Sequence, residues 1–275
     1  MNLQALFLQT ILTVAPPGYT KFSVTPVECQ GEACASYQWS TFYNSYVNKE
    51  TAEEGKIRYA VISGKIVPLA QKKLCFDDNL NTIPGCKRSN IFKGWKFTEL
   101  ASITGAAMIA ESGVREDVEN GRGRSGHIKE TDPLTDDAGG LGIGPGGEVC
   151  LVQVHPLVLA RFQIDPQTFL GEDGLENCFG FGMDMFGRSR AMCAYQAAKT
   201  PDLEHDWVFE TFSAYGTGST CASANNGKTA YRKSLYIAIA SDFGARIKKE
   251  MRREAKAAKA ANQSPTVPLP PPNKL

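Results

Sequence analysis

One carboxylate in this sequence is placed where general acid–base chemistry would need it. Glu111 follows the apolar run "AAMIA" and stands near the end of residues 96–112, whose apolar side chains recur at helical spacing. A carboxyl group partly removed from water has a raised pKa, so it stays protonated near neutral pH and can donate its proton. Protonation of a glycosidic oxygen requires such an acid. We therefore take Glu111 as the candidate general acid.

A second carboxylate near Glu111 would change the chemistry. An inverting glycoside hydrolase needs a carboxylate about 6.5–9.5 Å from the acid to activate water. Asp136, Asp137 and Glu148 follow Glu111 in a Gly- and Asp-rich stretch, from which one of them could approach it. Their spacing compels no assignment, so both a hydrolase and a mechanism with a single glutamate remain open.

Three short motifs occur in a fixed order along the chain. "MIAESG" contains Glu111, "CLVQVHP" contains Gln153, and "FSAYGTG" contains Tyr215. In this order they resemble the lysozyme-like soluble lytic transglycosylase superfamily, over roughly residues 95–245. The resemblance implies a mainly α, lysozyme-like (α+β) fold with a long Gly-rich loop or small β element. It also implies that Glu111 acts as acid and base while Gln153 and Tyr215 position the sugar or the glutamate.

The activity implied by the resemblance is cleavage of the MurNAc–GlcNAc bond of peptidoglycan, with the muramic acid C6 hydroxyl attacking in place of water. It implies peptidoglycan as the partner and no metal or cofactor. The motifs depart from the family pattern at Cys150, where glycine is usual, at Leu151–Val152, and at Gly216–Thr217, where asparagine and a small residue are common. A lysozyme-type hydrolase and a catalytically inactive, wall-binding virion protein with the same core are the alternatives.

Helical segments must hold these motifs in place. Residues 96–112 predict a helix with Thr98 as a candidate N-cap and Gly113 as its end. The N-terminal apolar segment predicts a helix that stops before Pro16. Further helices are expected over residues 172–200, 206–218 and 228–261. The Gly-rich run at residues 120–147 lacks the strand and helix context of a phosphate-binding loop, so it is interpreted as a connector or a substrate-contacting loop.

The cysteines favour disulfides over a zinc site. No two are spaced C-x-x-C, and the three histidines lie far from any cysteine pair in the sequence. Cys178 and Cys193, on one predicted helix, would be about 22 Å apart and cannot pair with each other. We therefore expect Cys150 with Cys178 and Cys193 with Cys221, whereas Cys75 and Cys86 could close a loop. The eight positions are Cys29, Cys34, Cys75, Cys86, Cys150, Cys178, Cys193 and Cys221.

Composition excludes several classes of protein. A net charge of +1 gives no indication of nucleic-acid binding, and no stretch approaches the ~20 apolar residues of a transmembrane helix. We expect no nucleic-acid partner. A run of basic residues near the C-terminus is interpreted as the solvated end of a helix. Its members are Lys248, Lys249, Arg252, Arg253, Lys256 and Lys259.

The chain divides into four predicted regions. Residues 1–94 have no assigned role, residues 95–245 form the lysozyme-like domain, residues 246–262 extend the last helix, and residues 263–275 are a Pro-rich tail. No Lys or Arg precedes the N-terminal apolar run, which leaves a signal peptide undecided. The expected source is a phage virion, with the protein as a tail or ejected component that acts at the cell wall and contacts other virion proteins. A secreted or periplasmic bacterial enzyme is the alternative.

Overall fold

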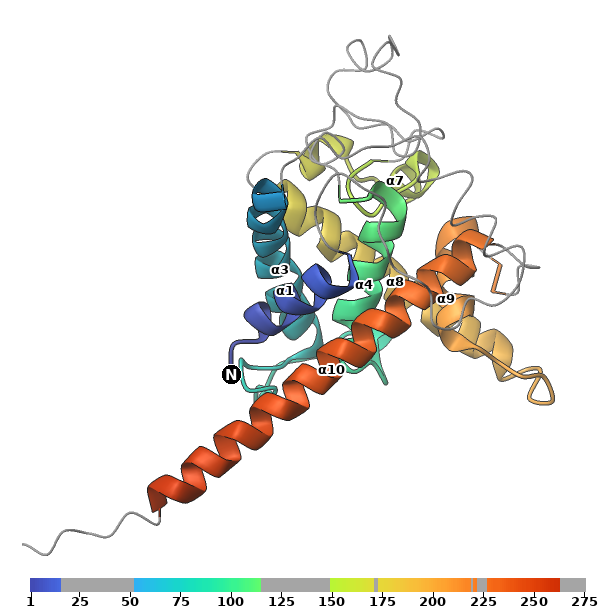
Figure 1. The fold of residues 1–275 in the computed structure, drawn as a ribbon. Helices are drawn as coiled ribbons and strands as arrows, with labels where there is room; N and C mark the ends of the chain where they lie inside the picture. Colours follow the sequence, from blue (N-terminus) through green and yellow to red (C-terminus); the bar gives the residue numbers. More distant parts are fainter. Residues whose placement is uncertain (16–51, 115–148, 171–172, 219, 222–226, 263–275) are drawn as a thin grey trace, which may run out of the picture.

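The protein is mainly helical, as predicted. A computed structural model describes residues 1–15, 52–114, 149–170, 173–218, 220–221 and 227–262 (Figure 1). Within these residues the β structure consists of two isolated bridges, one joining Phe76 to Thr82 and one joining Val149 to Val154. The Gly-rich run at 120–147 and the tail at 263–275 lie outside the described residues. The α-helices are α1 (Leu3–Val14), α3 (Ala52–Leu74), α4 (Phe97–Ser112), α7 (Pro156–Phe162), α8 (Gly174–Ala197), α9 (Trp207–Thr217) and α10 (Gly227–Asn262), with short 3₁₀ turns at Asn90–Phe92 and Pro166–Phe169.

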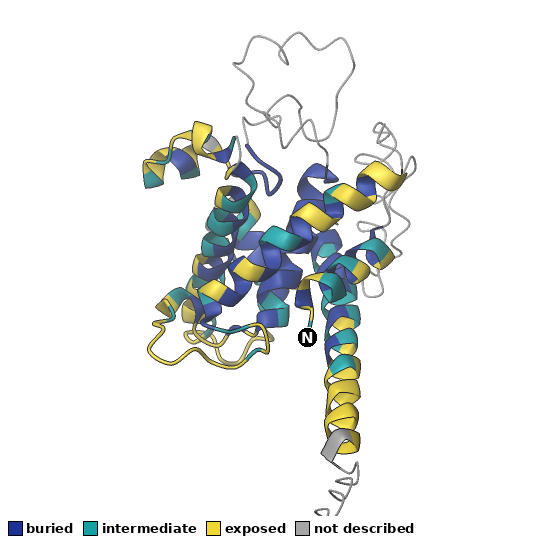
Figure 2. Cartoon of the chain, turned by 90° about the vertical axis from the view of Figure 1, so that its left-hand side faces the viewer, coloured by how far each residue is buried: buried dark blue, intermediate teal, exposed yellow. Residues whose placement is uncertain are grey.

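Helix α4 lies at the centre of the molecule and is buried on nearly every side (Figure 2). Its small residues allow neighbouring helices to approach closely: a Cβ atom at Gly105 would lie 3.2 Å from the Phe7 ring and 3.3 Å from Ile11. The helix begins at Phe97, so the expectation that Thr98 caps it is wrong. Glu99 instead accepts a hydrogen bond from the backbone N–H of Lys96, which satisfies a donor that the helix start leaves unpaired. Gly113 ends the helix with φ 62°, as predicted.

The N-terminal helices share one hydrophobic core with the rest of the chain. Helix α1 ends at Val14, ahead of Pro16 as predicted, and lies between α3 and α10. The Phe7 ring packs edge-on against Phe243 of α10 at 5.0 Å between centroids. Thr10 of α1 also donates a hydrogen bond of 2.8 Å to Asp242 of α10. Parts of the predicted 1–94 region are thus built into the core that supports α4.

An arginine that contacts two tryptophans joins the starts of α4 and α9 to α8. The Arg190 guanidinium lies 4.6 Å from the Trp95 ring centroid and 4.0 Å from that of Trp207. It also pairs with Glu99 at 3.0 Å. The two indole rings are nearly perpendicular, at 81°, and together with the Glu99 carboxylate they stabilise the Arg190 cation while it is largely buried.

The described residues contain three disulfides: Cys75–Cys86, Cys150–Cys178 and Cys193–Cys221. The pairings expected for Cys150 with Cys178 and for Cys193 with Cys221 are therefore confirmed. Cys178 and Cys193 both lie on α8, which explains why each needs a partner from a neighbouring segment. Cys29 and Cys34 lie outside the described residues.

Helix α10 is buried in its first half and exposed in its second (Figure 2). Every residue from 251 to 260 is exposed, so the basic end of this helix is solvated as expected. The N-terminal amine contacts Glu254 at 3.1 Å, which places the start of the chain beside this extension. None of the described helices is both long enough and apolar enough to cross a membrane.

Candidate functional site

Glu111 lies in the last turn of α4 and is paired with an arginine from α10. Its side chain is 4% exposed, and its Oε1 forms an ion pair with Nη2 of Arg232, whose side chain is 5% exposed. Burial of a carboxyl group favours its protonated form, whereas an adjacent guanidinium favours the ionised form. The carboxylate is therefore desolvated, as its sequence context predicts, but it also has a cation beside it that we did not predict.

Arg232 is seated against the C-terminal turn of α9. Its Nη1 donates a hydrogen bond of 3.4 Å to the carbonyl of Phe212. A Cβ atom at Gly216 would lie only 2.7 Å from the same nitrogen. Any side chain at position 216 would therefore displace the guanidinium. This close approach gives a physical reason for a glycine at position 216.

Gln153 lies in a tight turn, residues 149–154, that is closed by the bridge between Val149 and Val154. The Gln153 side-chain amide donates to the carbonyl of Cys150 at 2.8 Å and is almost fully buried. Its backbone has φ 55°. The side chain is thus used, in this structure, to hold the turn that carries it.

Tyr215 connects α9 to this turn. Its hydroxyl donates a short hydrogen bond to the carbonyl of Val152. The Tyr215 ring packs on Phe186 of α8 at 4.5 Å between centroids. Helix α9 contacts the Gln153 turn through the Tyr215 hydroxyl. It contacts Arg232, the partner of Glu111, through the Phe212 carbonyl. The three motifs are therefore brought into one connected region.

The chain around the site contains residues in left-handed backbone conformations. Val114, directly after the end of α4, has φ 62°, and Cys150 has φ 61°. Such conformations are uncommon for non-glycine residues and concentrate at functional sites. The Nε of Arg58 on α3 donates a hydrogen bond of 2.6 Å to the Val114 carbonyl. Helix α3 thereby fixes the direction in which the chain leaves Glu111.

The candidate second carboxylates, Asp136, Asp137 and Glu148, lie outside the described residues. Arg232 was missed, although the sequence contains a signal for it. On the final helix it occupies the same face as Leu235, Ile239 and Phe243, where a lone cation requires a buried partner.

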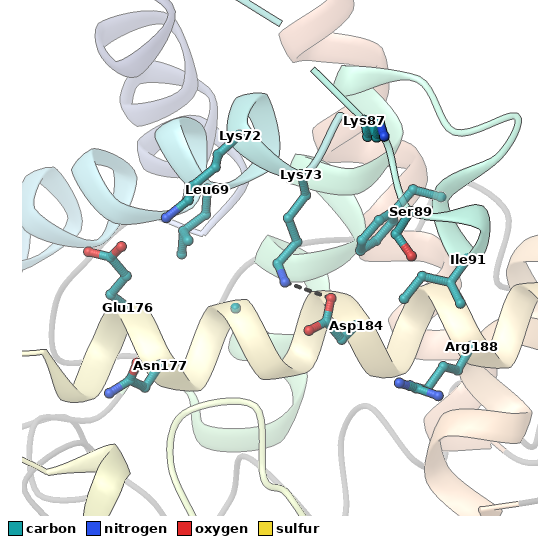
Figure 3. A pocket seen from close by; sticks show the side chains of 12 residues that line it. Leu69, Lys72, Lys73, Lys87, Ser89, Ile91, Glu176, Asn177, Asp184 and Arg188 are labelled. Atoms are coloured by element: carbon teal, nitrogen blue, oxygen red, sulfur yellow. Dashed lines mark hydrogen bonds and ion pairs between the residues drawn. The ribbon is translucent and has the colours of Figure 1, made fainter. Parts of the chain in front are cut away.

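A cavity lies away from Glu111, between α3, α8 and the segment after Cys86 (Figure 3). Its volume is about 590 Å³, and neither Glu111, Gln153 nor Tyr215 lines it. Its lining is rich in lysine and arginine.

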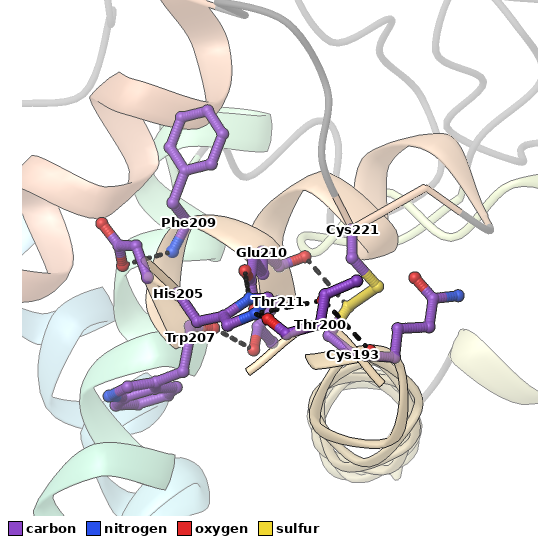
Figure 4. A network of polar contacts seen from close by, with 10 residues as sticks. Cys193, Thr200, His205, Trp207, Phe209, Glu210, Thr211 and Cys221 are labelled. Carbon is purple, nitrogen blue, oxygen red and sulfur yellow. Dashed lines mark hydrogen bonds and ion pairs between the residues drawn. A yellow bond between two sulfur atoms is a disulfide. The ribbon is translucent and has the colours of Figure 1, made fainter. Parts of the chain in front are cut away.

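A polar network lies at the N-terminal end of α9 (Figure 4). Nδ1 of His205 lies 2.8 Å from Glu210 and its Nε2 lies 3.0 Å from the Thr200 carbonyl. The hydrogen bond to Glu210 is the main cause of a raised pKa at His205, and that to Thr200 adds to it. The Cys193–Cys221 disulfide is adjacent, with the Cys193 sulfur 3.6 Å from the Glu210 carbonyl oxygen. This network is exposed, and it joins the N-terminal end of α9 to the segment that precedes the helix.

Within the part of the chain that the structure describes, no three His, Cys, Asp or Glu side chains are grouped as a metal site would require. Comparisons with protein-family models, curated proteins and solved structures found no match to this chain.

Proposed function

We propose that this protein is a peptidoglycan-cleaving glycosidase that acts as a lytic transglycosylase on the MurNAc–GlcNAc bond. The observation that carries the proposal is the Glu111 carboxylate, buried at the end of α4 beside Arg232 and connected through α9 to the Gln153 turn. A buried acid with a fixed charged neighbour is the kind of group that acid–base catalysis uses. The order of the three motifs supports the choice of substrate.

The proposed reaction needs one carboxyl group. Glu111 donates its proton to the glycosidic oxygen as the bond from that oxygen to C1 of MurNAc breaks. The C6 hydroxyl oxygen of the same MurNAc then bonds to C1, and its proton returns to Glu111. The enzyme is regenerated without water, and the product ends in a 1,6-anhydro sugar.

Arg232 has a defined role in this scheme as a positioning residue. When Glu111 has lost its proton, the guanidinium balances the buried negative charge, which would otherwise be costly in this dry environment. Its contact with the Phe212 carbonyl and its close fit to Gly216 fix the direction from which it approaches the carboxylate.

The disulfides bear on where the protein works. Disulfide bonds persist in oxidising compartments and are rare in the reducing cytosol. Three of them in the described residues favour action at the cell wall or in the periplasm. We propose that the protein reaches the wall as a virion component, with a secreted bacterial enzyme as the alternative.

A wall-binding protein without turnover is a second candidate. The pairing of Glu111 with Arg232 favours the ionised carboxylate, and an ionised carboxylate cannot act as an acid. A protein that kept the fold for binding alone would tolerate such a pair permanently. A hydrolase remains the alternative if one of Asp136, Asp137 or Glu148 activates water.

Zymography on a peptidoglycan gel and mass analysis of the released muropeptides test the proposal. Wild-type protein should release fragments with 1,6-anhydro ends, and Glu111→Gln should lower the rate by about 10²–10⁴-fold because the amide cannot donate and recover a proton. The rate is measured well below the melting temperature of the variant, because this change also leaves the buried Arg232 without an ionised partner. Glu99→Gln is the matched control, since Glu99 also lies on α4 and pairs with an arginine. Free reducing ends would indicate a hydrolase. Binding to the wall without any release would indicate the wall-binding protein.

A further inference from the structure

The cavity beside α8 has a floor built from one face of that helix. Glu176, Gly180, Asp184 and Arg188 follow each other at four-residue spacing and all line it. Gly180 leaves the middle of the floor open: a Cβ atom there would meet only Leu69 of α3, at 3.9 Å. Packing alone does not require a glycine at this position. Its absence of a side chain keeps the cavity free.

The wall opposite α8 is held rigidly. The Cys75–Cys86 disulfide returns the chain to the end of α3, directly before Lys87 and Ser89 of the lining. Arg88, between them, donates hydrogen bonds to the carbonyl of Leu74 from Nε at 3.1 Å and from Nη2 at 2.7 Å. The cavity is therefore pre-formed, which lowers the entropy cost of binding a ligand.

The charges that face the cavity are unbalanced. Its two carboxylates already have partners: Asp184 pairs with Lys73 at 2.6 Å (Figure 3), and Glu176 pairs with Lys65 at 3.5 Å. Lys72, Lys87 and Arg188 also line the cavity, and in the described part of the chain none of these three has a carboxylate within ion-pair distance. Apolar side chains of α3 and of the segment after Cys86 lie among them. This lining suits an organic anion with carboxylates along an extended backbone.

The cavity and the Gln153 turn lie on opposite faces of α8. Cys178 is bonded to Cys150 in that turn, and a Cβ atom at Gly182 would lie 3.0 Å from Val152. Residues 178 and 182 are each two positions from Gly180. Two positions correspond to a rotation of about 200° around the helix axis, which places these residues on the opposite face. One helix, about 10–12 Å across, therefore separates the two regions. A five-residue peptide spans up to about 17 Å when extended, which exceeds the width of α8.

We propose that this cavity binds the acidic stem peptide of peptidoglycan, with Lys72, Lys87 and Arg188 receiving its carboxylates. The inference rests on the proposed function for the identity of the ligand. It adds a second contact to the substrate, remote from the bond that is cut, and it selects strands whose stems carry free carboxylates.

Calorimetric titration of the full-length protein with a synthetic acidic stem pentapeptide tests this inference. The double variant Lys72→Gln/Lys87→Gln should weaken binding about tenfold, because each ion pair at an accessible site contributes up to about 1 kcal/mol. Gly180→Leu should weaken binding strongly, because it places a bulky side chain on the middle of the cavity floor. Gly244→Leu is its matched control, since Gly244 is a helical glycine on α10 with open space around it and does not line the cavity.

Two further probes decide the chemistry without any variant. The same peptide with its carboxylates amidated should bind the wild-type protein at least about tenfold more weakly. Equal binding of the two peptides, no binding of the acidic one, or complete displacement of it by equimolar inorganic phosphate would overturn the inference.

The peptide contains no glycosidic bond, so Glu111→Gln should bind it as the wild type does. A protein that binds the peptide but cuts no glycan would contradict the proposed activity and leave the peptide site standing.

Discussion

Two neighbouring cations on α10 meet two different ends of α9. Arg232 reaches the C-terminal end, where it pairs with Glu111 in a setting that leaves both side chains about 5% exposed or less. Lys233 reaches the N-terminal end, where it pairs with Asp206 at 2.7 Å while the side chains are 27% and 42% exposed. The two residues are adjacent in the sequence and have the same charge.

Burial makes these two ion pairs unequal. Removing one partner of a buried pair leaves an unpaired charge in a dry environment and typically costs about 3–5 kcal/mol. An exposed pair is screened by water and contributes about 0–1 kcal/mol. Removing a charge at the C-terminal end of α9 should therefore cost much more stability than removing one at the N-terminal end. The C-terminal end also connects to the Gln153 turn through Tyr215. The N-terminal end, with His205 and Glu210, is more exposed, so substitutions there should cost less stability.

The largest effect should come from Arg232→Met, which keeps the length and apolar stem of the side chain but removes its charge. We expect the free energy of unfolding to fall by about 3–5 kcal/mol, against less than about 1 kcal/mol for Lys233→Met. Chemical denaturation of both variants measures this difference. Equal losses in the two variants would show that burial does not make the two ion pairs unequal in stability.

The same variant separates a positioning role of Arg232 from a purely structural one. Without the guanidinium, the protonated form of Glu111 should persist to higher pH, so the alkaline limb of kcat/KM should move upward. Arg232→Lys should return the limb toward its original position, because the cation is restored. A uniform loss of activity at every pH would assign Arg232 a structural role only.

The next effect distinguishes two disulfides that close loops of equal length. Cys150–Cys178 and Cys193–Cys221 both have a sequence separation of 28, so the chain-entropy model assigns each about 3–4 kcal/mol. Replacing either pair with alanine should lower the melting temperature by similar amounts. Only loss of Cys150–Cys178 should also lower activity measured well below the melting temperature, because that bond anchors the Gln153 turn. Equal activity losses would show that the two ends of α9 are not functionally distinct.

The smallest effect concerns His205 at the exposed end of α9. Its pKa is raised above the ordinary value of 6.5 by the hydrogen bond to Glu210, so protonated His205 stabilises the fold. This contribution is complete below about pH 6.5 and is lost as the pH rises through the folded-state pKa. The melting temperature of wild type relative to His205→Gln should therefore be higher at pH 6 than at pH 9. A difference that does not change with pH would rule out the protonated pair as its source.

Much of the fold could be predicted because local patterns determine it. The helix ending at Gly113, the break before Pro16 and the long final helix follow from apolar periodicity and from the backbone preferences of glycine and proline. The distance that a helix imposes between Cys178 and Cys193 excluded a bond between them, and the cysteines of the flanking segments were then the expected partners. Thr98 was wrongly expected to cap α4. The side chain that accepts a hydrogen bond at the helix start is Glu99, from the backbone N–H of Lys96.

The sequence by itself determined that Glu111 would be a desolvated carboxylate at a helix end, because the apolar residues before it are local. Only the tertiary structure decided its partner. Arg232 is 121 positions further along the chain and reaches Glu111 because α10 packs across α4 and because Gly216 of α9 leaves space for the guanidinium. The cavity beside α8 likewise depends on α3 and a disulfide loop that are distant in sequence. Local patterns determine which segments form helices and which of their faces are buried, whereas contacts between distant segments decide which charges meet.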